Sequence, residues 1–159
     1  SWLFDMPEDK IDVVVHRESI IHSMIEFVDN SVIAQLGLPD MRIPIQYAIT
    51  YPNRYESPVK ELDLTEISNL SFYKPDYDTF KCLRACKKAI EIGKTAPAIA
   101  NGANEVANKM FRDGKIKFLE IGDLVYDALN NVEVQEIKRV EDVLNADKSA
   151  RQYVLDSVK

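Results

Sequence analysis

The chain contains only two histidines, and both lie within its first quarter. His22 lies in the run SIIHSMIEFVDNSVIAQLGLPDM, which begins at Ser19 and is apolar and strand-like on both sides of an Asp-Asn pair. A titratable imidazole at this place has two interpretations: a satisfied histidine at a sheet surface, or a side chain that faces a chemical site. His16 stands beside Arg17 and Glu18, where we expect a local ion pair or a capping hydrogen bond.

The surroundings of His22 depend on how the strands on either side of residues 29 and 30 pair. Asp and Asn tolerate positive φ, as the turn of a two-residue hairpin requires. Such a turn predicts that His22 stands opposite Gly37 and Met24 opposite Gln35. Because side chains alternate between faces, His22 then lies on the mixed face of the sheet. The opposite face is expected to form the core, with Ile21, Ser23, Ile25 and Phe27 against Leu38, Leu36, Ala34 and Val32.

The pattern as a whole predicts an α+β protein, with a small, mainly antiparallel sheet and one helix before a C-terminal bundle of about four helices. Residues 11–16 are β-branched and continuous, which is typical of a buried strand. Further strands are predicted at 20–28 and 31–36, and a helix at about 41–50 that ends before a Tyr-Pro pair. We expect a sheet domain over 1–56.

Beyond a connector at 57–77, the apolar period changes from two residues to about 3.6, which predicts a helical domain over 78–159. Asp78 is the expected N-cap of its first helix and Gly93 the residue that ends it. Later helices are predicted at about 98–112, at about 119–130, and from about 141 to the end. The side chains expected to be buried there are Leu83, Ile90, Val106, Met110, Leu124, Leu129, Val143 and Val154.

Composition argues against several classes of protein. The chain has 159 residues, of which 46% are apolar and 29% charged, and its net charge is −6. Nonspecific binding to nucleic acid needs Lys and Arg to neutralise phosphates, so this balance argues against it. No apolar run reaches the roughly 18–20 residues of a membrane helix, and the charged first ten residues do not fit a signal peptide. We therefore expect a cytoplasmic protein, with no membrane partner.

The other candidate groups favour structural roles. Cys82 and Cys86 are spaced i and i+4 on an expected helix, and we interpret them as reduced thiols. The two histidines have no evident third metal ligand, and no glycine-rich phosphate loop occurs. Asn101, Asn104 and Glu105 fall at the start of an expected helix, where they suit either capping and favourable charge or an interdomain contact.

Four stretches of the chain resemble the family of 1-deoxy-D-xylulose 5-phosphate reductoisomerases. They are HRESIIHSMIEFVDNSVIAQLGLPDMRIPIQYAITYPNR, PDYDTFKCLRACKKAIEIG, NGANEVAN and EDVLNADKSARQ, and they follow the family's order with compatible spacing. The smaller departures are NGANE in place of an Asn-Ala-Ala-Asn-Glu pattern, Arg17 and Glu18 in place of Pro-Gln, and Ile43 where Thr is common; the decisive departure is the absence of the family's upstream parts. The likeness covers nearly the whole chain.

This resemblance implies part of an NADPH-dependent enzyme that also needs Mg²⁺ or Mn²⁺. Members are homodimers that convert 1-deoxy-D-xylulose 5-phosphate, a sugar phosphate, to 2-C-methyl-D-erythritol 4-phosphate for isoprenoid biosynthesis. The apolar opening Ser1–Phe4 resembles the segment just after the family's last metal ligand. Residues 1–56 would then end the catalytic domain, and the nucleotide domain, metal ligands and phosphate-binding residues would precede them. We expect this chain alone to be inactive and to bind neither cofactor.

Position by position, the resemblance implies a substrate site without metal ligands in this chain. Ser19 and His22 match the family's active-site Ser and His, and His22 is the residue with a catalytic role. Pro39 and Met41 match an elbow that packs near the substrate, and Met41 also lies near the nicotinamide. A soft apolar side chain there would shield hydride transfer from water.

Two other interpretations remain open at this point. The chain could be a stand-alone binding module whose bundle is a docking surface, or a structural dimerisation domain built on the same sheet. A nucleotide-binding βαβ unit and a carboxylate cluster encoded upstream would favour the enzyme.

Overall fold

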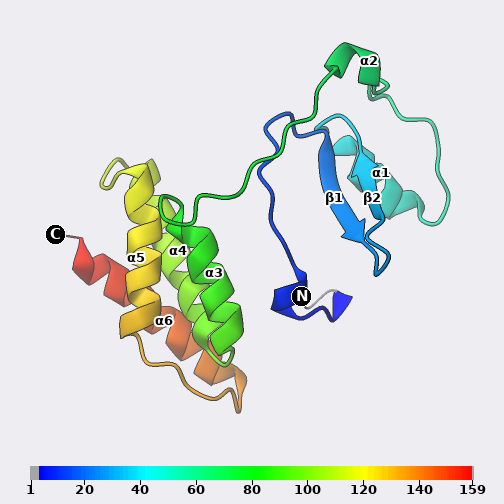
Figure 1. Ribbon diagram of the computed structural model, residues 1–159. Coiled ribbons are helices and arrows are strands. Elements are labelled where there is room, and N and C mark those ends of the chain that lie inside the picture. The colour runs from blue at the N-terminus through cyan, green and yellow to red at the C-terminus, as the bar shows by residue number, and fades with distance from the viewer. Residues whose placement is uncertain (1–3, 159) are drawn as a thin grey trace. The chain divides into compact units, whose positions relative to one another are not determined.

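The computed structural model describes residues 4–158, which form two compact units (Figure 1). The hairpin unit runs from Val13 to Lys74, and the bundle unit joins the segment before it to the chain from Pro75 onward. The chain therefore leaves the bundle unit and returns to it, with the hairpin unit inserted between. The domain boundaries expected near residues 56 and 78 stay a prediction.

The hairpin unit is built on a two-stranded antiparallel sheet. Strand β1 (Ile21–Glu26) pairs with β2 (Val32–Leu36), and helix α1 (Arg42–Thr50) and the short helix α2 (Leu64–Ile67) follow. Together with the helical bundle this confirms the α+β prediction, including the helix expected at 41–50.

The predicted hairpin register is wrong by one residue. Met24 pairs with Ala34 rather than Gln35, and Ile25 pairs with Ile33. The cause is a turn of three residues, in which the Phe27 N–H donates to the Ser31 carbonyl at 2.9 Å. Its last residue, Asn30, has φ of 65°, the left-handed conformation that three-residue hairpin loops place there.

His22 is the extra residue of a β-bulge. Ile21 pairs with Leu36 and Ser23 with Gln35, so β1 advances two residues while β2 advances one. His22 therefore does not stand opposite Gly37, as the two-residue turn had predicted. Bulges change the direction of side chains and are frequent beside active sites.

Two strands alone bury neither face of the sheet, so the predicted core face is wrong for this chain. Ile25 and Ile33 are 62% and 63% exposed, and Phe27 is also exposed. The strand expected at 11–16 is absent from the described residues apart from one bridge, between Val15 and Tyr73. A β-branched run forms a strand only where a neighbour offers backbone partners along its whole length.

The bundle unit holds four helices: α3 (Lys81–Ile92), α4 (Ala96–Arg112), α5 (Phe118–Asn131) and α6 (Val140–Ser157). A short 3₁₀ helix, η2 (Glu8–Lys10), is joined to α3 by an ion pair between Glu8 and Lys87 at 2.7 Å. Alanines dominate the core around the larger side chains Ile99, Val125 and Val154. Small side chains let the helices approach closely.

The predicted bundle core is partly confirmed. Met110, Leu129 and Val154 are buried, and Leu83, Val106, Leu124 and Val143 are half-buried. The prediction for Ile90 is wrong, because its side chain is 42% exposed. The buried face of α3 carries Ala85 and Ala89 instead, and Ile90 lies to one side of it.

Helix ends agree with the sequence at Gly93 but not at Asp78. Gly93 has φ of 67° and ends α3, as predicted. Asp76 rather than Asp78 supplies the side-chain cap, since its carboxylate accepts from the backbone N–H groups of Asp78 and Thr79. This turn precedes α3, which begins at Lys81.

None of the described helices combines the length and apolar composition needed to cross a membrane.

Helices α4 and α6 approach each other closely at Gly102. A Cβ atom there would lie 2.9 Å from the Asp147 backbone oxygen and 2.7 Å from its side-chain Oδ1. The Arg151 guanidinium donates to Asp147 at 2.7 Å and also pairs with Glu105 of α4. Glu105 therefore has a structural role between two helices of the bundle.

We predict that Gly102→Ala destabilises the bundle, because the added methyl group meets the backbone of α6. Overpacking of this kind costs about 1–3 kcal/mol, which outweighs the roughly 1 kcal/mol gained in helix propensity if the helices must separate. Asn101→Ala, on the exposed side of the same turn, is the control and is expected to raise stability slightly. Thermal unfolding of the two variants measures both effects. A melting temperature of Gly102→Ala at or above that of the control would contradict the close packing.

Candidate functional site

The buried ring of His16 is the centre of a half-buried network at the beginning of the hairpin unit. Its side chain is only 6% exposed and stacks on Phe72, with ring centroids 4.7 Å apart. The Ile20 N–H donates to Nε2 at 3.1 Å, and Nδ1 lies 2.8 Å from the Ser71 carbonyl oxygen. A backbone N–H can only donate, so Nε2 is the acceptor and Nδ1 carries the proton.

Glu18 completes this network from the same turn. Its carboxylate accepts from the Ser71 hydroxyl at 2.5 Å and from the Ser71 N–H at 3.3 Å, and it lies 3.1 Å from Nδ1 of His16. The hydrogen bond from the Ser71 hydroxyl lowers the pKa of Glu18 below its ordinary value. The expected capping hydrogen bond at His16 is therefore present. The contact with Glu18 is not an ion pair, because a ring whose Nε2 accepts a hydrogen bond carries no charge, and the carboxylate lies beside the protonated Nδ1.

Ser19 lies in the turn that this network holds. Its φ is 52°, which is unusual for a residue with a Cβ, and its N–H donates to the His16 carbonyl at 3.3 Å. Ser19 is exposed while Ile20 is buried. The turn thus places the Ser19 hydroxyl in solvent at the start of β1.

His22 is exposed, and its ring is oriented by Gln35. The Gln35 Nε2 donates to the Leu36 carbonyl at 3.0 Å, which turns its Oε1 toward His22 Nδ1 at 3.2 Å. An amide oxygen only accepts, so the proton of a neutral ring lies on Nδ1. Nε2 is then left with a free lone pair, which can accept a proton or a hydrogen bond from a ligand.

The elbow after β2 is held by one carboxylate. Asp40 accepts from the Arg42 N–H at 2.9 Å and from the guanidinium at 3.0 and 2.6 Å. These hydrogen bonds lower the Asp40 pKa to about 2, so the pair persists at neutral pH and is lost only as the pH falls toward that value. The elbow leaves Pro39 exposed and Met41 70% exposed.

The backbone brings the strand of His22 next to the chain that leads into the elbow. The Gly37 N–H donates to the Ile20 carbonyl at 3.0 Å, and Gly37 is buried. A Cβ at this glycine would lie 3.4 Å from Gln35 Nε2 and 3.6 Å from Ile43 Cδ1. Among the described residues no hydrogen bond joins the four predicted site side chains directly. The backbone bond between Gly37 and Ile20 is what connects the segments that carry them.

Sequence reasoning missed two parts of this arrangement. The predicted register pairs Gln35 with Met24. The contact of Gln35 with His22 follows only from the bulge. The asparagine at position 30, which suits the last residue of a three-residue loop, was the available signal. The contribution of His16 to the turn at Ser19 depends on Ser71, which is far away in the sequence.

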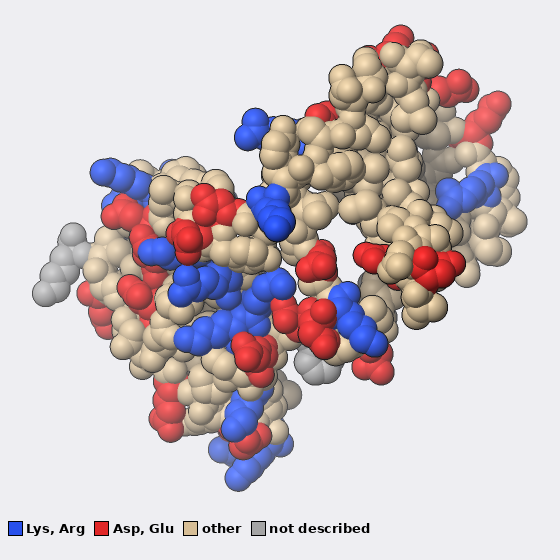
Figure 2. Space-filling view, viewed as in Figure 1, with Lys and Arg blue, Asp and Glu red and all other residues tan. Residues whose placement is uncertain are grey.

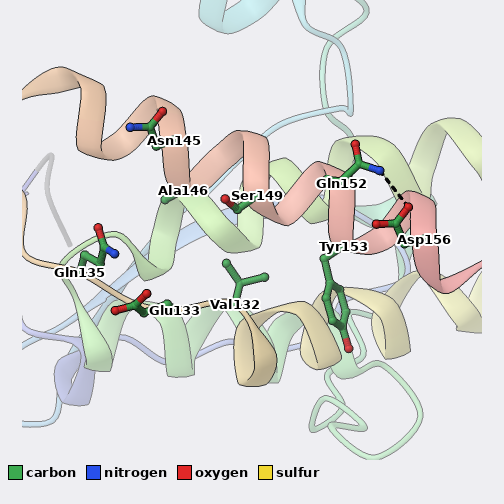
Figure 3. A pocket seen from close by; sticks show the side chains of 9 residues that line it. All are labelled: Val132, Glu133, Gln135, Asn145, Ala146, Ser149, Gln152, Tyr153 and Asp156. Atoms are coloured by element: carbon green, nitrogen blue, oxygen red, sulfur yellow. Dashed lines mark hydrogen bonds between the residues drawn. The ribbon is translucent and has the colours of Figure 1, made fainter.

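The bundle unit has a hollow of about 480 Å³ beside α6 (Figure 3). Glu133, Gln135, Tyr153 and Asp156 are among the residues that line it, and Gln152 is hydrogen-bonded to Asp156 at 2.8 Å. All of these side chains are exposed or half-buried. The hollow thus has no buried polar group that would fix a ligand.

Charged side chains of both signs are interleaved over the bundle (Figure 2). Between α3 and α5 they form a ladder, in which Lys81 pairs with Asp123 and Lys88 donates to Asn130 at 2.5 Å. Arg84 lies over the ring of Tyr126, and its hydrogen bond to the hydroxyl lowers the pKa of that residue. These cations already have partners, so the ladder joins two helices.

Residues 4–158 contain no group of three His, Cys, Asp or Glu that could hold a metal ion.

Comparisons with known proteins agree on one family. The model of the DXP reductoisomerase C-terminal domain matches residues 36–153. The 1-deoxy-D-xylulose 5-phosphate reductoisomerase of Bacillus subtilis is 52% identical over 154 residues, which are 96% of this chain and 40% of that protein. The enzyme of Clostridium perfringens strain SM101 is 48% identical over 98% of this chain and 40% of its own length.

Solved structures give the same result. The Zymomonas mobilis reductoisomerase in complex with NADPH has a TM-score of 0.89 and 38% identity, over 99% of this chain and 42% of that one. A DOX-P reductoisomerase in complex with NADPH, fosmidomycin and magnesium has a TM-score of 0.91 and 37% identity, over 98% of this chain and 40% of that one. The chain spans about 40% of the length of its relatives. On these matches, it belongs to the 1-deoxy-D-xylulose 5-phosphate reductoisomerase family.

Proposed function

We propose that this chain is the C-terminal part of an enzyme that converts 1-deoxy-D-xylulose 5-phosphate to 2-C-methyl-D-erythritol 4-phosphate with NADPH. The observation that carries the proposal is the 52% identity to a reductoisomerase along almost the whole chain. The exposed imidazole of His22, oriented by Gln35, supports it. The sequence resemblance implied the same reaction.

In this proposal the hairpin unit supplies one wall of the substrate site. The free Nε2 of His22 accepts a hydrogen bond or a proton from a substrate hydroxyl, and the Ser19 hydroxyl orients a second oxygen atom. Pro39 and Met41 form an apolar surface at the elbow, with Met41 near the nicotinamide. The bulge sets the position of His22 in β1. The ion pair between Asp40 and Arg42 holds the elbow that carries Pro39 and Met41.

The cofactors of the proposed enzyme are NADPH and Mg²⁺ or Mn²⁺. Residues 4–158 do not fit the metal, because they offer no cluster of three ligands. The sequence has no glycine-rich phosphate loop either. We therefore assign no metal ligand to this chain, and Met41 is the one residue that we assign to the nicotinamide.

A homodimer and a cytoplasmic location belong to the same proposal. The hairpin leaves Ile25, Val32 and Ile33 exposed, and apolar groups of this kind are normally covered by a partner or by further chain. The net charge of −6 argues against nucleic acid as a partner, and we propose no membrane partner. The same apolar hairpin favours the alternative function, a stand-alone binding or dimerisation module.

We predict that this chain alone neither binds NADPH tightly nor turns over substrate, since it has no phosphate cradle and no carboxylate cluster. Calorimetric titration with NADPH, and NADPH absorbance with substrate and Mg²⁺, measure the two properties. Micromolar binding or any turnover would show that the site is complete within these residues.

The proposed function is tested by a fusion enzyme, in which this chain replaces the corresponding C-terminal segment of the Bacillus subtilis relative. We expect the fusion enzyme to consume NADPH with 1-deoxy-D-xylulose 5-phosphate and Mg²⁺. A fusion enzyme that is folded and dimeric but has no turnover would contradict the proposal and favour the binding module.

In the fusion enzyme, His22→Gln is predicted to lower kcat/KM by roughly 10²–10⁴, the usual contribution of a positioned acid–base group. The side chain is exposed, so the melting temperature should change little. Ser23→Ala, the next residue of β1 and also exposed, is the matched control and should keep normal kinetics. Normal kcat/KM for His22→Gln with a lowered melting temperature would reverse the assignment.

A further inference from the structure

We propose that His16 is a positioning residue of the substrate site, which fixes the turn at Ser19 and with it the start of the strand that carries His22. The inference rests on the proposed function, because Ser19 and His22 face substrate only if the chain is part of that enzyme. The family resemblance gave His16 no role. The observation behind it is the pair of opposite hydrogen bonds made by one buried ring.

The turn at Ser19 needs an external partner. Ser19 has φ of 52°, where the Cβ crowds the backbone, so the conformation persists only if its surroundings hold it. Ile20 is buried, and its N–H would lack a partner without the His16 ring. Nε2 of His16 supplies that partner at 3.1 Å. One hydrogen bond thus satisfies a buried donor and holds the adjoining residue in an unfavourable conformation.

The ring is itself fixed from a distant segment. Nδ1 donates to the Ser71 carbonyl at 2.8 Å, and Phe72 stacks on the ring face. Val15 and Tyr73 exchange two backbone hydrogen bonds of 2.9 Å directly beside these residues. The position of the turn at Ser19 is therefore set by residues 71–73, which follow it by about 50 positions.

His16 acts through the backbone rather than on the substrate. Its side chain is 6% exposed and both ring nitrogens already have partners, so it cannot reach a ligand. The two ring nitrogens have different partners, and a different amide side chain can replace each of them. The Oε1 of a glutamine can take the place of Nε2 as acceptor, whereas the amide of an asparagine reaches only as far as Nδ1 and can donate to Ser71.

The test compares His16→Gln with His16→Asn in the fusion enzyme. We expect His16→Asn to lower kcat on the order of 10²-fold, the cost of misplacing a catalytic group by about 1 Å, with the amount of folded dimer unchanged. His16→Gln should recover most of the lost kcat, because it keeps the acceptor for the Ile20 N–H. Equal kcat values for the two variants at equal folded content would overturn the proposal, since a purely structural role predicts no such difference.

Nitrogen NMR of this chain gives a second measurement that needs no activity. The His16 ring should be protonated at Nδ1 and unprotonated at Nε2, and the Ile20 amide signal should move in His16→Asn but much less in His16→Gln. A proton on Nε2, or an Ile20 amide unaffected by both variants, would overturn the proposal even if a variant fails to fold in the fusion enzyme. A wild-type fusion enzyme without turnover would instead remove the proposed function, and the assignment of His16 to that site with it.

Discussion

The arrangement of the hairpin unit depends on the hydrogen bond from the Ile20 N–H to Nε2 of His16. This bond requires a neutral ring, since a protonated imidazole would turn a donor toward another donor. It closes a turn whose backbone is otherwise unfavourable at Ser19. The strand that begins there runs directly into the bulge at His22, so an error in the turn would be carried to the proposed catalytic side chain.

The two units differ in how completely their own residues bury their apolar side chains. In the bundle, alanines and Gly102 allow close helix contacts. Arg151 pairs with Asp147 of its own helix and with Glu105 of α4. The hairpin, by contrast, leaves apolar side chains exposed on both of its faces, among them Met24, Ile25 and Ile33. This contrast agrees with relatives that are about two and a half times as long, since the chain covers 40% of them.

The apolar periodicity and the residues that end helices were enough to predict the four bundle helices from sequence, whereas helix α2 lies in the predicted connector. The apolar period of 3.6 and the glycine at position 93 gave α3 to α6 within a few residues. The hairpin register was wrong because Asp-Asn suits a two-residue turn as well as the last two positions of a three-residue loop. The difference lies in the φ of Asn30 and in the hydrogen bond between Phe27 and Ser31, neither of which composition determines. Alternation also assumed two distinct faces, whereas two strands without a covering layer bury neither.

The candidate site was only partly accessible to sequence reasoning. The resemblance named Ser19, His22, Pro39 and Met41, but the supports of these residues are contacts over longer range, from Ser71 to His16 and from Gln35 to His22. Such contacts depend on the register and on the return of the chain, which local patterns do not contain. The resemblance therefore supplies a prediction of the side chains that face a substrate, while the structure shows which contacts hold the segments that carry them.

The assignment of His22 is tested most directly by a crystal structure of the fusion enzyme with bound substrate. We expect the hydrogen bond between His22 Nδ1 and the Gln35 amide oxygen to persist, and Nε2 to lie within about 2.6–3.2 Å of a substrate oxygen. A productive complex in which the His22 ring points away from the substrate, or has released Gln35 to reach it, would show that the assignment is wrong.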